Sequence, residues 1–149
     1  MNILKEITDT NAKCRCENAI YFLNGKVVLF DGDLYKGYKI SGIKNIKDEE
    51  NDINWGILYF MYSDKSKDYL VYAGETGHGG AGFIALKRLN SNIFEWVLHL
   101  NNCNNFISVA FDGDNIIAKS DEPYPEGSKF IVPIDNPDKF EVNNKNIRN

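Results

Sequence analysis

A glycine-rich segment, residues 74–82, comes closer to a chemical motif than any other part of the sequence. Gly77, Gly79 and Gly82 match the G-x-G-x-x-G spacing of dinucleotide-binding loops. In those loops the glycines permit a tight turn, and a helix then presents its N-terminus to the pyrophosphate. Residues 83–89 favour a strand instead, and no acidic residue follows the motif at the distance of about 20 positions needed to bind a ribose. We therefore expect no dinucleotide and no other cofactor here.

Two interpretations of this segment remain. It is a flexible hairpin loop, because glycine accepts positive φ. Alternatively it is a mobile loop that binds a small ligand or substrate, since binding residues are often carried on loops. In the second case Glu75, Thr76 and His78 would be its polar contacts.

The cysteines and histidines are too few and too badly spaced for a metal site. Cys14 and Cys16 are separated by one residue, and only Cys103, His78 and His99 could complete a ligand set. Structural zinc sites use four ligands, often with two residues between paired cysteines. We expect no bound metal and reduced thiols. The sequence leaves open whether a cysteine approaches a histidine, as a catalytic pair would require.

Carboxylates and aromatic residues suggest a surface that binds another protein. The carboxylates of Asp31, Asp33, Asp112 and Asp114 stand in turns, where aspartate commonly shapes the backbone. An acidic run followed by a tryptophan could steer and anchor a basic partner; its residues are Asp48, Glu49, Glu50, Asp52 and Trp55. We expect most other large aromatic residues to pack in the core, with one or two exposed at an interface; they include Tyr59, Tyr62, Tyr69, Tyr72, Trp96 and Tyr124.

Short strands joined by turns must position these residues. Apolar runs separated by turn signals predict roughly nine or ten strands; their ranges are 19–23, 26–30, 34–40, 55–62, 69–73, 83–89, 93–100, 106–111, 116–120 and 129–134. At most one or two short helices are expected, with residues 3–12 and 80–90 as candidates. The pattern predicts a mainly β fold: an antiparallel sandwich, an open barrel or a strongly bent sheet.

Two local details follow from the same pattern. Residues 31–33, Asp-Gly-Asp, are expected to reverse the chain between two strands. In residues 93–100, a period of two places Phe94 on the same face as Trp96, and His99 on the opposite face.

The length and charge of the chain limit its class. It has 149 residues and a net charge of −4, which favours one domain spanning residues 1–149, with a frayed tail at 143–149. Its basic residues are scattered, so we expect no nucleic-acid binding. It carries no signal-peptide pattern and no long apolar run, so we expect a cytoplasmic protein that is not in a membrane.

The C-terminal half resembles small immunity proteins of bacterial toxin–immunity systems. The resemblance lies in segments 95–100, 105–109, 116–120 and 130–134. It implies a cytosolic, non-enzymatic protein that blocks a partner toxin domain by occlusion. The leading hypothesis is thus a protein-binding domain, and the alternative is a ligand-binding protein or enzyme that uses residues 74–82. The identity of the partner, the strand order and the oligomeric state do not follow from the sequence; exposed strand edges that pair between copies are a third possibility.

Overall fold

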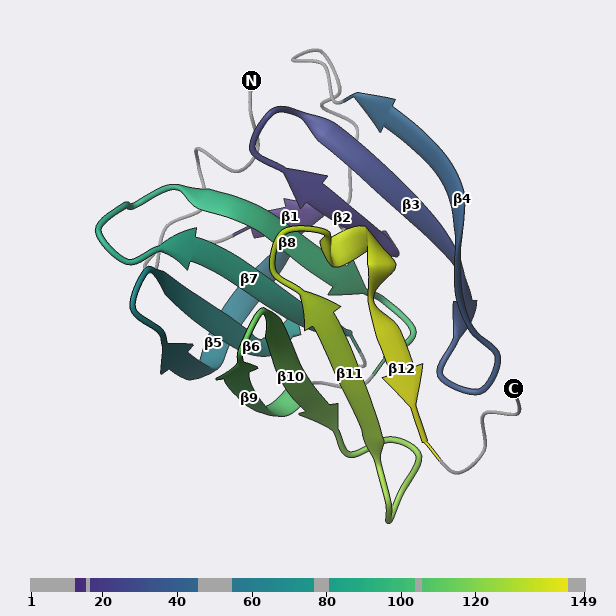
Figure 1. Ribbon diagram of the computed structural model, residues 1–149. Coiled ribbons are helices and arrows are strands. Elements are labelled where there is room, and N and C mark those ends of the chain that lie inside the picture. Colours follow the sequence, from purple (N-terminus) through teal and green to yellow (C-terminus); the bar gives the residue numbers. More distant parts are fainter. Residues whose placement is uncertain (1–12, 16, 46–54, 77–80, 104–105, 145–149) are drawn as a thin grey trace.

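Two antiparallel β-sheets packed face to face form the protein (Figure 1). The computed structural model describes residues 13–15, 17–45, 55–76, 81–103 and 106–144. The larger sheet has eight strands in the order β1-β5-β6-β7-β8-β2-β3-β4. Its strands are β1 (Lys13–Arg15), β2 (Ala19–Phe22), β3 (Lys26–Asp33), β4 (Gly37–Asn45), β5 (Trp55–Lys65), β6 (Tyr69–Thr76), β7 (Gly82–Arg88) and β8 (Phe94–Leu100).

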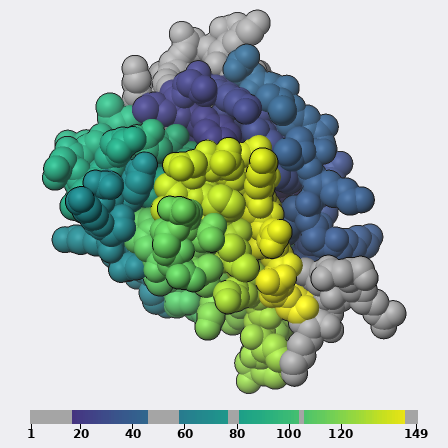
Figure 2. All heavy atoms as spheres, in the orientation of Figure 1, coloured from purple at the N-terminus to yellow at the C-terminus, as the bar shows by residue number. Residues whose placement is uncertain are grey.

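The smaller sheet is a meander of the last four strands, in the order β12-β11-β10-β9. These are β9 (Phe106–Asp112), β10 (Asn115–Ser120), β11 (Ser128–Pro133) and β12 (Glu141–Asn143), with a 3-10 turn, η2 (Pro137–Lys139), before the last. In the space-filling view the smaller sheet, green to yellow, occupies the front of the molecule (Figure 2).

The predicted fold class is confirmed: the chain is mainly β and its antiparallel sheets stack as a sandwich. The described residues form twelve strands rather than nine or ten, because β1 and β12 are three-residue strands too short to leave a pattern. The helix candidate at 80–90 is wrong, since β7 occupies that range. The helix candidate at 3–12 lies outside the described residues. Within the described part of the chain, no helix is long and apolar enough to cross a membrane.

The sequence of β7 is compatible with a strand or a helix because nearly all of its residues are buried. Six of its seven residues, Gly82 to Lys87, are buried, because the larger sheet is covered on both faces at this strand. A strand buried on both faces shows a continuous apolar run instead of alternation, and such a run does not distinguish a strand from a helix.

The structure tests two expected turns and part of the expected C-terminal tail. The turn expected between the strands at 19–23 and 26–30 is confirmed: it is Asn24-Gly25, with Gly25 at φ 90° between β2 and β3. Residues 31–33 do not reverse the chain, because they belong to β3 and pair with residues 37–39 of β4. The chain turns at residues 34–36, where the Asp33 carboxylate accepts hydrogen bonds from the backbone N–H groups of Tyr35 and Lys36. Of the tail expected at 143–149, Asn143 pairs with Lys129 in the smaller sheet, and residues 145–149 lie outside the described residues.

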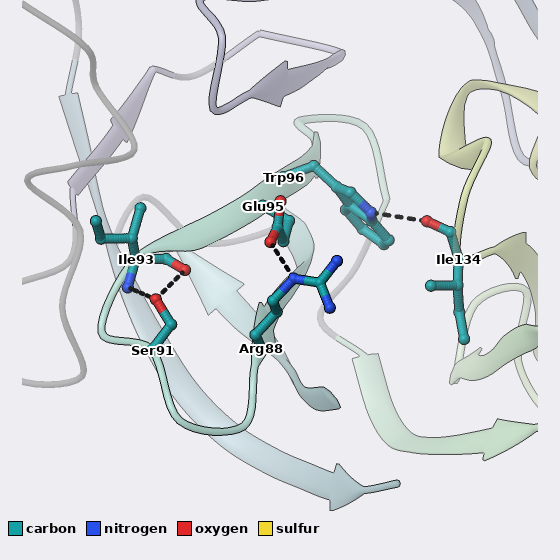
Figure 3. A network of polar contacts seen from close by, with 6 residues as sticks. All are labelled: Arg88, Ser91, Ile93, Glu95, Trp96 and Ile134. Atoms are coloured by element: carbon teal, nitrogen blue, oxygen red, sulfur yellow. Dashed lines mark hydrogen bonds and ion pairs between the residues drawn. The ribbon is translucent and has the colours of Figure 1, made fainter. Parts of the chain in front are cut away.

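One face of the larger sheet packs on the smaller sheet and forms the main core. Large side chains of both sheets meet there, including Ile84, Leu98, Phe106 and Phe130, all fully buried. Trp96 of β8 joins the layers: its indole Nε1 donates a hydrogen bond to the carbonyl of Ile134 at 3.1 Å (Figure 3). The same view shows the Arg88–Glu95 ion pair, 3.1 Å long, between the end of β7 and the start of β8.

The other face of the larger sheet carries a second buried cluster. Its fully buried members include Ala19, Tyr21, Phe83, Phe94 and Val97. Phe94 therefore does not share a face with Trp96, as alternation had predicted. The register shifts between Leu86 and Lys87, so that Leu86 pairs with Trp96 while Lys87 pairs with Phe94. This irregularity moves the Phe94 side chain to the opposite face.

Candidate functional site

The two ends of the glycine-rich segment belong to strands: residues 74–76 end β6, and Gly82 begins β7. Strand β6 continues to Thr76 and β7 begins at Gly82, so residues 77–81 connect them, and all of these except Ala81 lie outside the described residues. His78 falls in that gap. Because Gly82 opens a strand, no helix follows the motif, and the requirement for a dinucleotide site is not met.

The two described ligand candidates of this segment differ in access. Glu75 is half-buried and pairs with Tyr59 on one side and Gly82 on the other. Thr76 is 1% exposed, and its backbone N–H donates to the carbonyl of Ala81 at 3.1 Å. Its hydroxyl has no hydrogen-bond partner within the described part of the chain. A ligand in solvent could thus touch Glu75, whereas it could reach Thr76 only if the hairpin opened.

The predicted partner-binding residues cannot be placed. Asp48, Glu49, Glu50 and Asp52 lie outside the described residues. Trp55 is the first residue of β5 and pairs with Arg15 of β1, but its side chain is not described. The hypothesis that this run steers a partner therefore stays a prediction.

His99 and Cys103 do not form a catalytic pair. His99 pairs with Ala19 and Phe83 of the second cluster, whereas Cys103 belongs to the main core on the other face of the larger sheet. Burial raises the pKa of the Cys103 thiol to about 12, so the thiol stays protonated at neutral pH. A protonated, fully buried thiol is a poor nucleophile.

His99 is instead a buried imidazole held in its neutral form. Its Nδ1 lies 2.7 Å from the backbone oxygen of Glu17, and because that oxygen only accepts, Nδ1 carries the proton. Its Nε2 has no hydrogen-bond partner among the described residues. Desolvation lowers the pKa of His99, against a smaller opposing effect of the Glu17 carbonyl and charge. The folded protein therefore disfavours protonation of this ring.

This lowered pKa predicts that the protein loses stability in mild acid. Below the unfolded-state pKa of about 6.5, the unfolded chain binds a proton that the folded chain refuses. The free energy of unfolding should fall by up to about 1.4 kcal/mol per pH unit until the folded-state pKa is reached. Urea unfolding between pH 7.5 and 5.5 measures this. His99→Asn, which keeps a donor for Glu17, should remove that part of the slope; an unchanged slope would contradict the assignment to His99.

A polar and aromatic surface lies between the β3–β4 hairpin and the β10–β11 loop. A shallow depression there is lined by two tyrosines, two carboxylates and a proline: Tyr35, Asp121, Glu122, Pro123 and Tyr124. We refer to it as the tyrosine–carboxylate depression. Tyr124 is 87% exposed and Tyr35 is 48% exposed. The loop that carries Tyr124 projects at the lower edge of the molecule in Figures 1 and 2.

Hydrogen bonds fix both walls of this depression. The Asn144 side-chain amide donates to the Leu34 carbonyl at 2.6 Å and to the Ser128 hydroxyl at 3.1 Å. The Ser128 hydroxyl in turn donates to the Glu122 carbonyl at 2.6 Å. Within the loop, the Gly127 N–H donates to the Pro123 carbonyl at 2.7 Å. Asn144 thus links the β3–β4 hairpin to the β10–β11 loop. These hydrogen bonds hold in place the backbone segments that carry the exposed tyrosines.

Sequence reasoning found only part of this surface. The sequence predicts no strand between residues 120 and 129, and it places Tyr124 among the aromatic residues considered for an interface. Tyr35 was not singled out, because only the packing of β4 beside β12 brings its hairpin to that loop. No protein-family model, curated protein sequence or solved structure matches the chain.

Proposed function

We propose that this chain is a non-enzymatic protein-binding domain whose tyrosine–carboxylate depression receives basic side chains of a partner. The carrying observation is the pairing of exposed Tyr35 and Tyr124 across a depression that also holds the carboxylates of Asp121 and Glu122. Tyrosine is enriched at protein interfaces because it buries a large rigid area at low entropic cost. Carboxylates beside aromatic faces attract lysine and arginine both by charge and through the aromatic ring.

Two further features support a binding role. The hydrogen bonds of Asn144 and Ser128 hold the loop in place before a partner arrives, and a preorganised surface loses less entropy on binding. The chain's net charge of −4 also favours encounter with a basic partner.

The partner that fits this reading is a basic toxin domain, blocked by occlusion as immunity proteins block theirs. Support comes from the resemblance of segments 116–120 and 130–134 to such proteins: these segments largely coincide with β10 and β11, the strands that carry the loop of the depression. Occlusion requires only tight docking over the partner's site, and no catalytic group of this chain.

Affinity capture from the source organism tests the proposal. The tagged full chain is compared with the double variant Tyr35→Ala/Tyr124→Ala, and bound proteins are quantified by mass spectrometry. We expect one stoichiometric basic partner. Truncating two hot-spot tyrosines at about 2 kcal/mol each would weaken its Kd by about a thousandfold, so the double variant should capture far less of it. The rate at which the captured partner associates with the purified chain should fall steeply as the salt concentration rises.

Tyr59→Ala is the matched control, since Tyr59 is as exposed as Tyr35, at 48%, but lies on β5. It should capture the partner as the unaltered chain does. Equal capture by the double variant would show that the partner binds elsewhere, and the absence of any stoichiometric partner would contradict the proposal as a whole.

A further inference from the structure

Four polar residues form a row straight across the outer face of the smaller sheet. Lys119 of β10 pairs with Ser108 of β9 and with Lys129 of β11, and Lys129 pairs with Asn143 of β12. All four are exposed. We refer to Ser108, Lys119, Lys129 and Asn143 as the lysine row.

The two lysines at the centre of the row are direct cross-strand neighbours. In an antiparallel pair, the Cβ atoms of opposed residues are about 4.5–5.5 Å apart, and like charges at such positions repel. Within the described part of the chain, no ion pair involves either Lys119 or Lys129. The sheet thus places two positive charges side by side, and neither is ion-paired with a carboxylate of the described residues.

A depression adjoins this pair. Its lining includes Ile107, Ser120, Asn144 and both lysines, together with Asp121 and Glu126 from the β10–β11 loop. Ile107 is 41% exposed, and it supplies an apolar rim. Side-chain donors of Ser108 and Asn143 flank the lysines at the two ends of the row.

We infer that the lysine row binds a phosphate monoester as its dianion. Two ammonium groups match the charge of about −1.5 to −2 that a phosphate monoester carries near neutral pH. Lysine binds phosphate as a point charge and needs no planar geometry. The amide of Asn143, which lines the same depression, can donate to a remaining oxygen. A bound dianion also removes the repulsion between the two lysines, so binding should stabilise the fold. This site does not depend on the proposed protein partner.

Titration with methyl phosphate at constant ionic strength tests the inference, with amide chemical shifts of the full chain as the readout. We expect saturable shifts at Ser108, Lys119, Lys129 and Asn143, and at least tenfold weaker binding in both Lys119→Gln and Lys129→Gln. Each variant should fold at least as stably as the original, because it relieves the repulsion. Asp121→Asn should bind more tightly, since it removes a carboxylate from the lining of the depression.

Lys39→Gln is the matched control: it removes the same charge from exposed Lys39 on β4 and should leave phosphate binding unchanged. Acetate, with a single charge, should bind at least tenfold more weakly than methyl phosphate. The inference is overturned if acetate or chloride produces the same shifts, or if Lys119→Gln binds methyl phosphate as tightly as the unaltered chain.

Discussion

Replacing Phe130 with alanine should lower the free energy of unfolding by about 3–5 kcal/mol. Phe130 is fully buried on β11 and faces the larger sheet. Its ring lies 5.0 Å from that of Phe106, edge to face, and 6.1 Å from that of Phe140. It also contacts Tyr38 of β4 across the sandwich, with centroids 6.5 Å apart. Truncation therefore opens a cavity bounded by both sheets, which neither sheet can close alone.

The neighbouring residue provides the control for this substitution. Ile131 points to the outer face of the same strand and is only half-buried. Ile131→Ala should cost about 1 kcal/mol, as is usual for a partly exposed side chain. Chemical denaturation of the two variants measures the difference. If both substitutions cost the same, the packing of the two sheets through Phe130 is not what stabilises the fold.

The fold class was predictable because short-range signals repeat along this chain. Asn24-Gly25 and Asp112-Gly113 mark turns, and both occur between paired strands with glycine at positive φ. The pairing of distant strands left no such signal. Strand β2 inserts between β8 and β3, and nothing near Ala19 in the sequence indicates that it pairs with His99.

Errors occurred where register shifts or double burial break the alternation. Phe94 changes face through a one-residue shift, and β7 hides its strand character because both of its faces are covered. The tyrosine–carboxylate depression and the lysine row depend on the same long-range information. Tyr35 meets Tyr124 only after the sandwich closes, and Lys119 faces Lys129 only in the final register.

Replacing Gly74 with alanine should destabilise the protein by about 3 kcal/mol, near the upper end of the usual cost of overpacking. A Cβ at this position would lie 1.9 Å from the backbone oxygen of Tyr59 and 3.1 Å from its carbonyl carbon. The pairing of β5 with β6 shifts between Phe60 and Tyr62, so β5 bulges at Met61 beside Gly74. The obstructing atoms belong to the backbone, so no side-chain rotation can relieve the clash.

Gly42→Ala is the matched comparison, since Gly42 also lies inside a strand but a Cβ there would meet only the Leu29 side chain, at 3.8 Å. This variant should be neutral or more stable by about 0.5 kcal/mol, because alanine loses less backbone entropy on folding. Thermal or urea unfolding separates the two outcomes, and an equal effect would argue against the close approach of β5. If Gly74→Ala is costly while Gly42→Ala is not, the first glycine of the 74–82 segment is required by strand packing, and its presence gives no support to a ligand loop.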